Sequence, residues 1–421
     1  MINVAKLVSG TTLAQAIPFL ALPLITRLFT PSDFASLEQF IMLVEILVIP
    51  ATLKYEFAIM QPKHNEDAKQ LLYFVLLFCF SVSLLYSLIG FFAAPKAAEM
   101  FNNPDALWFI PLVGVGVFLA GINLGFNYWF SRQKRYGLLA STKVIETSTA
   151  EGSKIGFWYG GFRNLGLVYG FLTGRLLMTS TYITRYIKGT SAAFSGFNGK
   201  RMRALLKEFS EYPRYTTLGS FFGRATAWLH IFMFSIYFEP VVGFIALARR
   251  LAFAPLNIIS LSFSQVFYQK ISEVNDSRKL QKIYDMALRP LLVFGVVIII
   301  VVYLLPDNTF SFVFGEKWGM AQPYVEILIF WFVANFISTC FAFILLRLNK
   351  QKQMLQLDIA HFILVFLSIY VGILSNWDAI STLKLFASVQ AGYYAFMIWL
   401  GRYYVKEFAY QNNLDSEEDD Q

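Results

Sequence analysis

A stripe of charged residues lies inside one largely apolar stretch of the chain, residues 137–160. Lys143, Glu146, Glu151 and Lys154 follow the spacing i, i+3, i+8, i+11, which puts all four on one face of a helix. The lysines are candidates for binding an anionic substrate, and the glutamates for binding a coupling proton or sodium ion. The alternative is structural, because each Lys/Glu pair spaced by three residues can neutralise itself.

Arginines in other apolar stretches form a second set of candidate substrate-binding residues: Arg27, Arg224, Arg249 and Arg250. Arg249 and Arg250 are adjacent and cannot face the same way, so we expect at least one to enter the interior. Guanidinium groups bind phosphate oxygens in a bidentate manner, which points to an anionic phosphate-type ligand. For any single arginine, the alternative is an ion pair with a carboxylate such as Glu38 or Glu45.

Glu38 and Glu45 lie seven residues apart and share a helix face. Together with Glu146 and Glu151, they are the candidates for coupling an ion to transport. The three histidines and the two cysteines are scattered, without metal-ligand spacing. We therefore predict no metal site, and no cofactor.

Prolines interrupt the same apolar stretches, and the candidate hinges are Pro18, Pro23, Pro50 and Pro255. Each proline frees a backbone carbonyl and permits a kink. Most of the buried cations lie on these stretches, so the expected moving parts coincide with the expected polar site.

Composition identifies the elements that must position these residues. Hydrophobic residues make up 57% of the chain and charged residues 15%, against about 25% charged in soluble proteins. The apolar runs have the length of membrane helices rather than of barrel strands. We predict an all-α polytopic membrane protein with about twelve spans: 4–28, 34–60, 69–94, 105–131, 137–160, 163–187, 212–238, 241–268, 287–314, 320–346, 354–376 and 379–404.

The loops alternate in charge, because those after even-numbered spans are rich in Lys and Arg and those after odd-numbered spans are poor in them. The positive-inside rule then puts both termini in the cytoplasm. The same bias accounts for the net charge of +8, which needs no nucleic-acid partner.

A short turn motif suggests two related halves. Phe29, Pro31 and Phe34 are echoed, with one inserted residue, by Phe238, Pro240 and Phe244. Two-half architectures are common in transporters. The alternative is that such turns recur by chance between membrane helices. We predict six-helix bundles at 1–187 and 212–404, joined by a cytoplasmic linker, 188–211, and followed by an acidic cytoplasmic tail, 405–421, whose acidic run 415–420 is expected to be disordered.

The linker contains a short amphipathic helix between residues 200 and 209. We expect its apolar face to rest on membrane lipids, with its cations toward the headgroups. The residues of that face are Met202, Leu205, Leu206 and Phe209.

Four sequence blocks resemble bacterial polysaccharide flippases of the O-antigen (Wzx) type. They are Leu22-Pro-Leu-Ile-Thr-Arg-Leu-Phe-Thr-Pro-Ser-Asp-Phe34, Lys54-Tyr-Glu-Phe-Ala-Ile-Met-Gln-Pro62, Tyr212-Pro-Arg-Tyr-Thr-Thr217, and the run from Gly243 through Arg250 and Pro255 to Glu273. Phe314-Gly-Glu-Lys-Trp318 fits an outer loop of the family. Arg250 matches the arginine of the family pattern, whereas Arg249 has no counterpart in it.

The resemblance implies membership of the multidrug/oligosaccharidyl-lipid/polysaccharide exporter superfamily. It implies two six-helix bundles around a central cleft, which alternate between inward- and outward-open forms in the bacterial inner membrane. The implied substrate is an undecaprenyl-diphosphate-linked oligosaccharide moved to the periplasmic leaflet, with a polysaccharide polymerase and a chain-length regulator as possible partners.

Two other functions compete with this one. A drug exporter of the same superfamily would need acidic residues to attract cationic drugs, and the candidates here are mostly basic. A membrane enzyme, such as an O-antigen polymerase or a glycosyltransferase, usually carries a sizeable extramembrane loop with catalytic residues, and the predicted outer loops are short.

Overall fold

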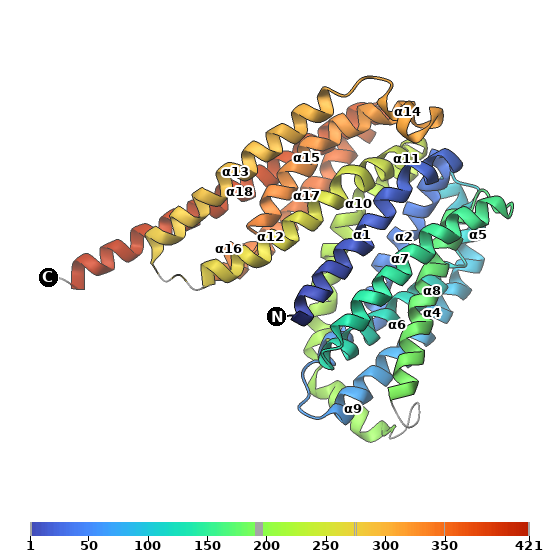
Figure 1. The fold of residues 1–421 in the computed structure, drawn as a ribbon, viewed down its shortest axis with the longest axis horizontal. Helices are drawn as coiled ribbons and strands as arrows, with labels where there is room; N and C mark the ends of the chain where they lie inside the picture. Colours follow the sequence, from blue (N-terminus) through green and yellow to red (C-terminus); the bar gives the residue numbers. More distant parts are fainter. Residues whose placement is uncertain (1, 190–196, 273, 275, 349, 420–421) are drawn as a thin grey trace. The chain divides into compact units, whose positions relative to one another are not determined.

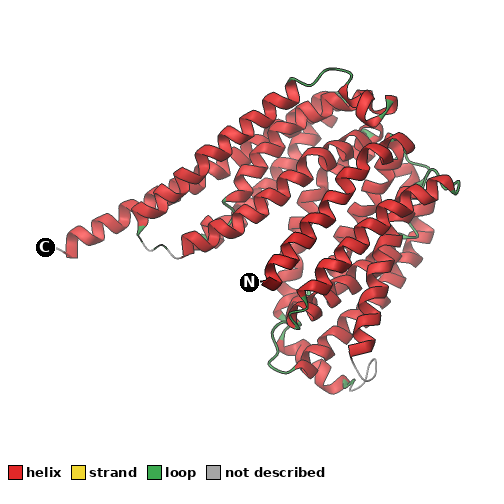
Figure 2. Ribbon diagram, in the orientation of Figure 1, coloured by secondary structure: helices red, strands yellow, loops and turns green. Residues whose placement is uncertain are grey.

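The computed structural model describes residues 2–189, 197–272, 274, 276–348 and 350–419. Within these ranges the chain consists of helices and their connections, without a strand (Figures 1 and 2). The expectation of an all-α fold is confirmed. The long helical segments match the predicted spans in order: α1 (Ile2–Leu28), α2 (Pro31–Thr52), α4 (Asn65–Met100), α6 (Val113–Arg132), α7 (Tyr136–Tyr159), α8 (Gly166–Gly189), α10 (Thr217–Tyr237), α11 (Glu239–Ala248) with η2 (Arg249–Phe253) and α12 (Ala254–Ser272), α13 (Ser277–Tyr303), α15 (Gln322–Cys340), α17 (Gln351–Leu374) and α18 (Ala379–Asp419).

Among the described residues, seven helices are long and apolar enough to cross a membrane: Pro31–Thr52, Asn65–Met100, Val113–Arg132, Val241–Ser272, Arg278–Tyr303, Glu316–Cys340 and Lys352–Leu374. The helix α7 is not among them, because its charged stripe lowers its apolar character. The chain is a multi-pass membrane protein.

Several predicted spans are interrupted by turns. The span 34–60 ends as α2 at Thr52, and Leu53 and Lys54 then adopt left-handed conformations with φ of 50° and 58° before the short α3 (Tyr55–Ala58). Pro50 lies in the last turn of α2, where its missing N–H weakens the helix. Turns also separate α5 (Ala106–Phe109) from α6, α13 from α14 (Thr309–Phe314), and α15 from α16 (Ile344–Arg347).

The other candidate hinge prolines behave differently from Pro50. Pro18 and Pro23 lie within α1, which continues through both. Pro255 follows the π-helical turn η2, and such wider turns often accompany a disturbed hydrogen-bond ladder. Motion at any of these prolines stays a prediction.

Contacts divide the chain into two compact units, Met1–Gly243 and Phe244–Gln421. In the first unit, α7 packs against α1 and α8, and α10 packs against α2. In the second unit, α15 packs against α12, α13 and α18. The contact boundary therefore lies after α10, and the bundle limits at 187 and 212 stay a prediction.

The amphipathic helix of the linker is α9 (Gly199–Glu208), and the membrane location expected for its apolar face is wrong. Leu205 is 1% exposed and belongs to the core of the first unit, with Leu206 and Phe209 packed against that core. Arg201 pairs with Asp67 of α4 through Nε–Oδ1 and Nη2–Oδ2 distances of 2.7 and 2.6 Å. The apolar face lies on protein because the N-terminal part of α4, with Ala68, Leu71 and Leu72, offers it an apolar surface.

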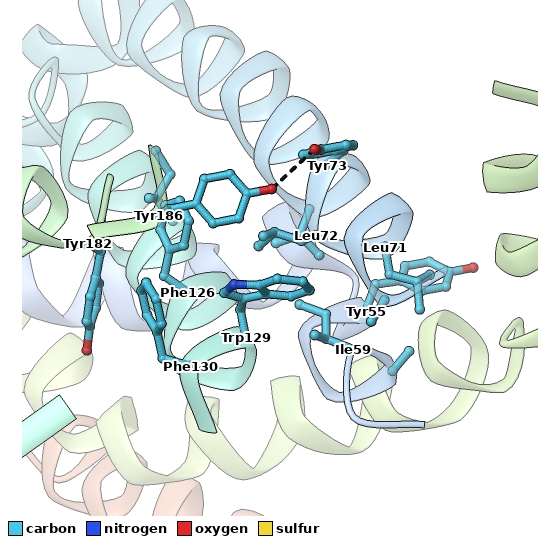
Figure 3. Packing of buried hydrophobic residues seen from close by; sticks show 14 of the residues in the cluster. Tyr55, Ile59, Leu71, Leu72, Tyr73, Phe126, Trp129, Phe130, Tyr182 and Tyr186 are labelled. Atoms are coloured by element: carbon cyan, nitrogen blue, oxygen red, sulfur yellow. Dashed lines mark hydrogen bonds between the residues drawn. The ribbon is translucent and has the colours of Figure 1, made fainter. Parts of the chain in front are cut away.

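Figure 3 shows part of this core. Phe126, Trp129 and Phe130 of α6 pack with Tyr182 and Tyr186 of α8. The hydroxyl groups of Tyr186 and Tyr73 are 3.2 Å apart and share a hydrogen bond, which satisfies buried polar atoms among the rings.

The acidic run 415–420 was also expected to be disordered, and this is wrong for its described residues, 415–419. The helix α18 continues from Ala379 to Asp419. Residues 405–419 contain neither Gly nor Pro, so the sequence has no strong helix breaker after the last span.

Candidate functional site

Five charged residues from four helices meet in the first unit. They are Glu45 of α2, Lys143 and Glu146 of α7, Arg175 of α8 and Arg224 of α10. We call this set the charge cluster. It contains three cations and two carboxylates, so it carries one excess positive charge.

Close packing of α7 and α8 brings two of these helices together. A Cβ added at Gly174 of α8 would lie 2.5 Å from the carbonyl oxygen of Glu146, and one at Gly170 would lie 2.8 Å from the backbone nitrogen of Lys154. Glycine at both positions lets the backbones approach, as small residues do between membrane helices. Arg175 follows Gly174 directly and is therefore held near Glu146.

Arg175 is the centre of the charge cluster. Its Nη2 donates a hydrogen bond to Oε1 of Glu45 at 3.0 Å, and its Nε lies 3.8 Å from Oε1 of Glu146. The guanidinium carbon also lies 4.6 Å from the ring centroid of Phe171, one helical turn earlier. One cation thus links α8 with α2 and α7.

Each of the two remaining cations, Lys143 and Arg224, contacts one carboxylate of the cluster. Lys143 donates to Oε2 of Glu146 at 2.7 Å. Arg224 approaches Oε2 of Glu45 with Nη1 at 3.7 Å. The Arg224 side chain is 48% exposed and that of Arg175 is 16% exposed, so Arg224 is the more accessible guanidinium.

Glu151 and Lys154 form a second ion pair on α7. Lys154 Nζ donates to Glu151 Oε1 at 2.6 Å, and the two side chains are 4% and 11% exposed, respectively. Both predicted i, i+3 pairs of the stripe are therefore present, as the structural alternative required. Roles in substrate or ion binding for these four residues stay predictions.

The other predicted residues are not members of the charge cluster. Arg27 is in the last turn of α1 and exposed, and Glu38 is buried in α2, two turns before Glu45. Arg249 and Arg250 are half-buried in η2 of the second unit. The ion pair with Glu45, which was the alternative for Arg224, is confirmed.

Sequence reasoning missed Arg175, the most connected residue of the cluster. The signal was present, because an arginine in the middle of the predicted span 163–187 is costly unless it faces the interior. Its importance also depends on Gly170 and Gly174, whose spacing marks a close helix contact. For metals, no group of three or more His, Cys, Asp or Glu side chains suited to an ion occurs among the described residues.

Comparison with solved structures identifies the fold. An inward-facing multidrug resistance MATE family transporter of the MOP superfamily matches with a TM-score of 0.71 at 14% identity, covering 94% of this chain and 95% of that one. The lipid II flippase MurJ, in an inward closed conformation, matches with a TM-score of 0.72 at 13% identity, covering 98% and 91%. A MOP superfamily transporter from Pyrococcus furiosus matches with a TM-score of 0.62 at 12% identity, covering 96% of each chain.

No curated protein matches the sequence. A family model described as "Polysaccharide biosynthesis protein" matches residues 24–323, which is well over half of the 421-residue chain. The match includes all of the charge cluster and the sequence blocks on which the resemblance rests, except the first two residues of the earliest block. The chain therefore belongs to the polysaccharide biosynthesis protein family and has the fold of the MOP superfamily.

Proposed function

We propose that the protein is a flippase that moves an undecaprenyl-diphosphate-linked polysaccharide repeat unit, such as an O-antigen unit, from the cytoplasmic to the periplasmic leaflet. It works by alternating access in the bacterial inner membrane, with both termini in the cytoplasm. Membership of the polysaccharide biosynthesis family and the fold shared with a lipid II flippase support this proposal. A polysaccharide polymerase and a chain-length regulator are its proposed partners.

The observation that carries the proposal is the excess positive charge of the cluster, with a half-exposed guanidinium at its edge. A diphosphate offers several charged oxygens in the geometry that a guanidinium binds best. In surroundings of low dielectric, such a contact is stronger than in water. Arg224 is therefore the proposed first contact for the diphosphate, with Arg27, Arg249, Arg250, Lys143 and Lys154 as further candidates.

Drug export is the second candidate, because a multidrug transporter shares the fold. The charge cluster argues against cationic drugs as the substrate. Its two carboxylates are both engaged by cations, and the sum of its charges repels a further cation.

Reconstitution distinguishes the two candidates. Purified protein in proteoliposomes should move a fluorescent undecaprenyl-diphosphate oligosaccharide between leaflets, and Arg224→Gln should slow this movement. Ethidium export from the same vesicles should equal that of protein-free vesicles. Export of ethidium without movement of the lipid-linked sugar would replace the flippase proposal with drug transport.

A further inference from the structure

Glu45 makes two unequal contacts. Its Oε1 accepts a hydrogen bond from Arg175 at 3.0 Å, whereas its Oε2 lies 3.7 Å from Nη1 of Arg224, beyond hydrogen-bonding distance. The Arg175 side chain is 16% exposed and that of Arg224 is 48% exposed. The carboxylate is therefore anchored on the interior arginine and only loosely associated with the accessible one.

The anchor has its own support. Arg175 is confined by the Phe171 ring at 4.6 Å and by Glu146 at 3.8 Å, and Lys143 holds Glu146 at 2.7 Å. If Glu45 leaves Arg224, it keeps its hydrogen bond to Arg175. No carboxylate is then stranded without a counter-charge, which would be costly in a poorly solvated site.

We propose that Glu45 occupies the position of an anionic ligand on Arg224, and that a diphosphate-type anion binds by exchange with this carboxylate. Arg175 is the positioning residue, because it holds Glu45 near enough to neutralise the empty site but not tightly enough to block it. This inference rests on the proposed function, since the diphosphate is the headgroup of the proposed substrate. It adds an internal competitor that sets the affinity of the site.

The exchange predicts opposite effects for the two ends of the Glu45–Arg224 contact. The probe is inorganic pyrophosphate without magnesium, titrated by calorimetry into the full chain in nanodiscs of neutral lipid. Glu45→Gln should bind it about fivefold more tightly, because a partly exposed ion pair of about 1 kcal/mol no longer competes. Arg224→Gln should lose binding, and Glu45→Gln should give no gain in the Arg224→Gln background.

Arg175 acts through Glu45, so its effect must depend on Glu45. Arg175→Met should weaken pyrophosphate binding, because the released carboxylate then pairs fully with Arg224. The double variant Arg175→Met/Glu45→Gln should bind as tightly as Glu45→Gln alone. The double variant removes both charges of the Arg175–Glu45 pair. If the single Arg175→Met variant does not fold, the double variant still tests whether Arg175 acts through Glu45. The matched control is Arg185→Met, an exposed arginine on α8, which should bind as the wild type does.

These measurements distinguish a failure of the exchange at Glu45 from a failure of diphosphate recognition at Arg224. If Arg224→Gln abolishes binding but Glu45→Gln binds no better than wild type, the exchange is wrong and the diphosphate contact stands. If the double variant binds as weakly as Arg175→Met, Arg175 has a general structural role and the positioning claim is wrong. If neither the wild type nor Glu45→Gln binds pyrophosphate, recognition of the diphosphate at Arg224 fails, and the exchange fails with it.

Discussion

Arg175 shows how a single side chain can balance charge inside a membrane protein. Its guanidinium faces Glu45 on one helix and Glu146 on another, and all three side chains are largely shielded from solvent. A pair of this kind need not add much net stability, but removing one partner leaves the other charge uncompensated. The stability of the first unit should therefore depend on the balance of charge more than on any single contact.

We expect Arg175→Met to lower the free energy of unfolding by about 1–3 kcal/mol, because Glu45 and Glu146 each lose a largely buried counter-charge. The double variant Arg175→Met/Glu45→Gln should recover part of this loss, because residue 45 then no longer needs that counter-charge. The thermal midpoint in detergent measures both. Arg185→Met is the control. If Arg175→Met has the thermal midpoint of the wild type, the stability of the first unit does not depend on the balance of charge.

At the scale of elements, the contact between α7 and α8 determines whether the charge cluster assembles. Gly174→Ala would place a methyl group 2.5 Å from the backbone carbonyl of Glu146, which cannot rotate away. We expect the helices to separate, with a loss of about 1–3 kcal/mol as in other overpacked sites. The thermal midpoint should fall, and pyrophosphate binding should weaken with it.

Gly156→Ala on α7 is the matched control, because an added Cβ there meets no atom within 4 Å. This substitution should leave the midpoint unchanged or raise it, since alanine favours a helix by roughly 0.5–1 kcal/mol over glycine. If Gly156→Ala and Gly174→Ala lower the thermal midpoint equally, the close approach of α7 and α8 is not the reason for a glycine at position 174.

The docking of α9 is the second arrangement at this scale, and its apolar contact should dominate its ion pair. Leu205 is 1% exposed, so Leu205→Ala should cost about 2–5 kcal/mol and release α9 from α4. The Arg201 side chain is 50% exposed, so Arg201→Gln should have little effect. Limited trypsin digestion at Lys207 checks both variants, and faster cleavage in Arg201→Gln than in Leu205→Ala would reverse this ranking.

The sequence predicts the helices well because membrane spans can be recognised by the length and apolar character of their sequence. Both ion pairs within α7 also follow from spacing on one helix. The links between helices are harder to predict, because the contact of Arg175 with Glu45 depends on how α2, α7 and α8 pack. The prediction that α9 rests on lipid was wrong for the same reason. An apolar face such as that of Leu205 can contact lipid or protein, and the sequence alone does not distinguish the two.

At the scale of the whole molecule, the excess positive charge has a consequence for the energy of the proposed transport. Moving one charge through 100 mV is worth about 2.3 kcal/mol, so a diphosphate with two negative charges gains up to about 4–5 kcal/mol on leaving a negative cytoplasm. The emptied cationic site is drawn back toward the cytoplasm by the same potential. We therefore expect the membrane potential to assist both halves of the cycle.

A potassium gradient with valinomycin tests this expectation in proteoliposomes that hold lipid-linked oligosaccharide. The rate of flipping should rise with a potential that is negative on the cytoplasmic side and fall when the potential is reversed. Glu45→Gln makes the site more cationic, which should increase the dependence of the return step on potential. Flipping that ignores the potential but responds to a proton or sodium gradient would instead favour ion antiport through carboxylates such as Glu38, Glu45, Glu146 and Glu151.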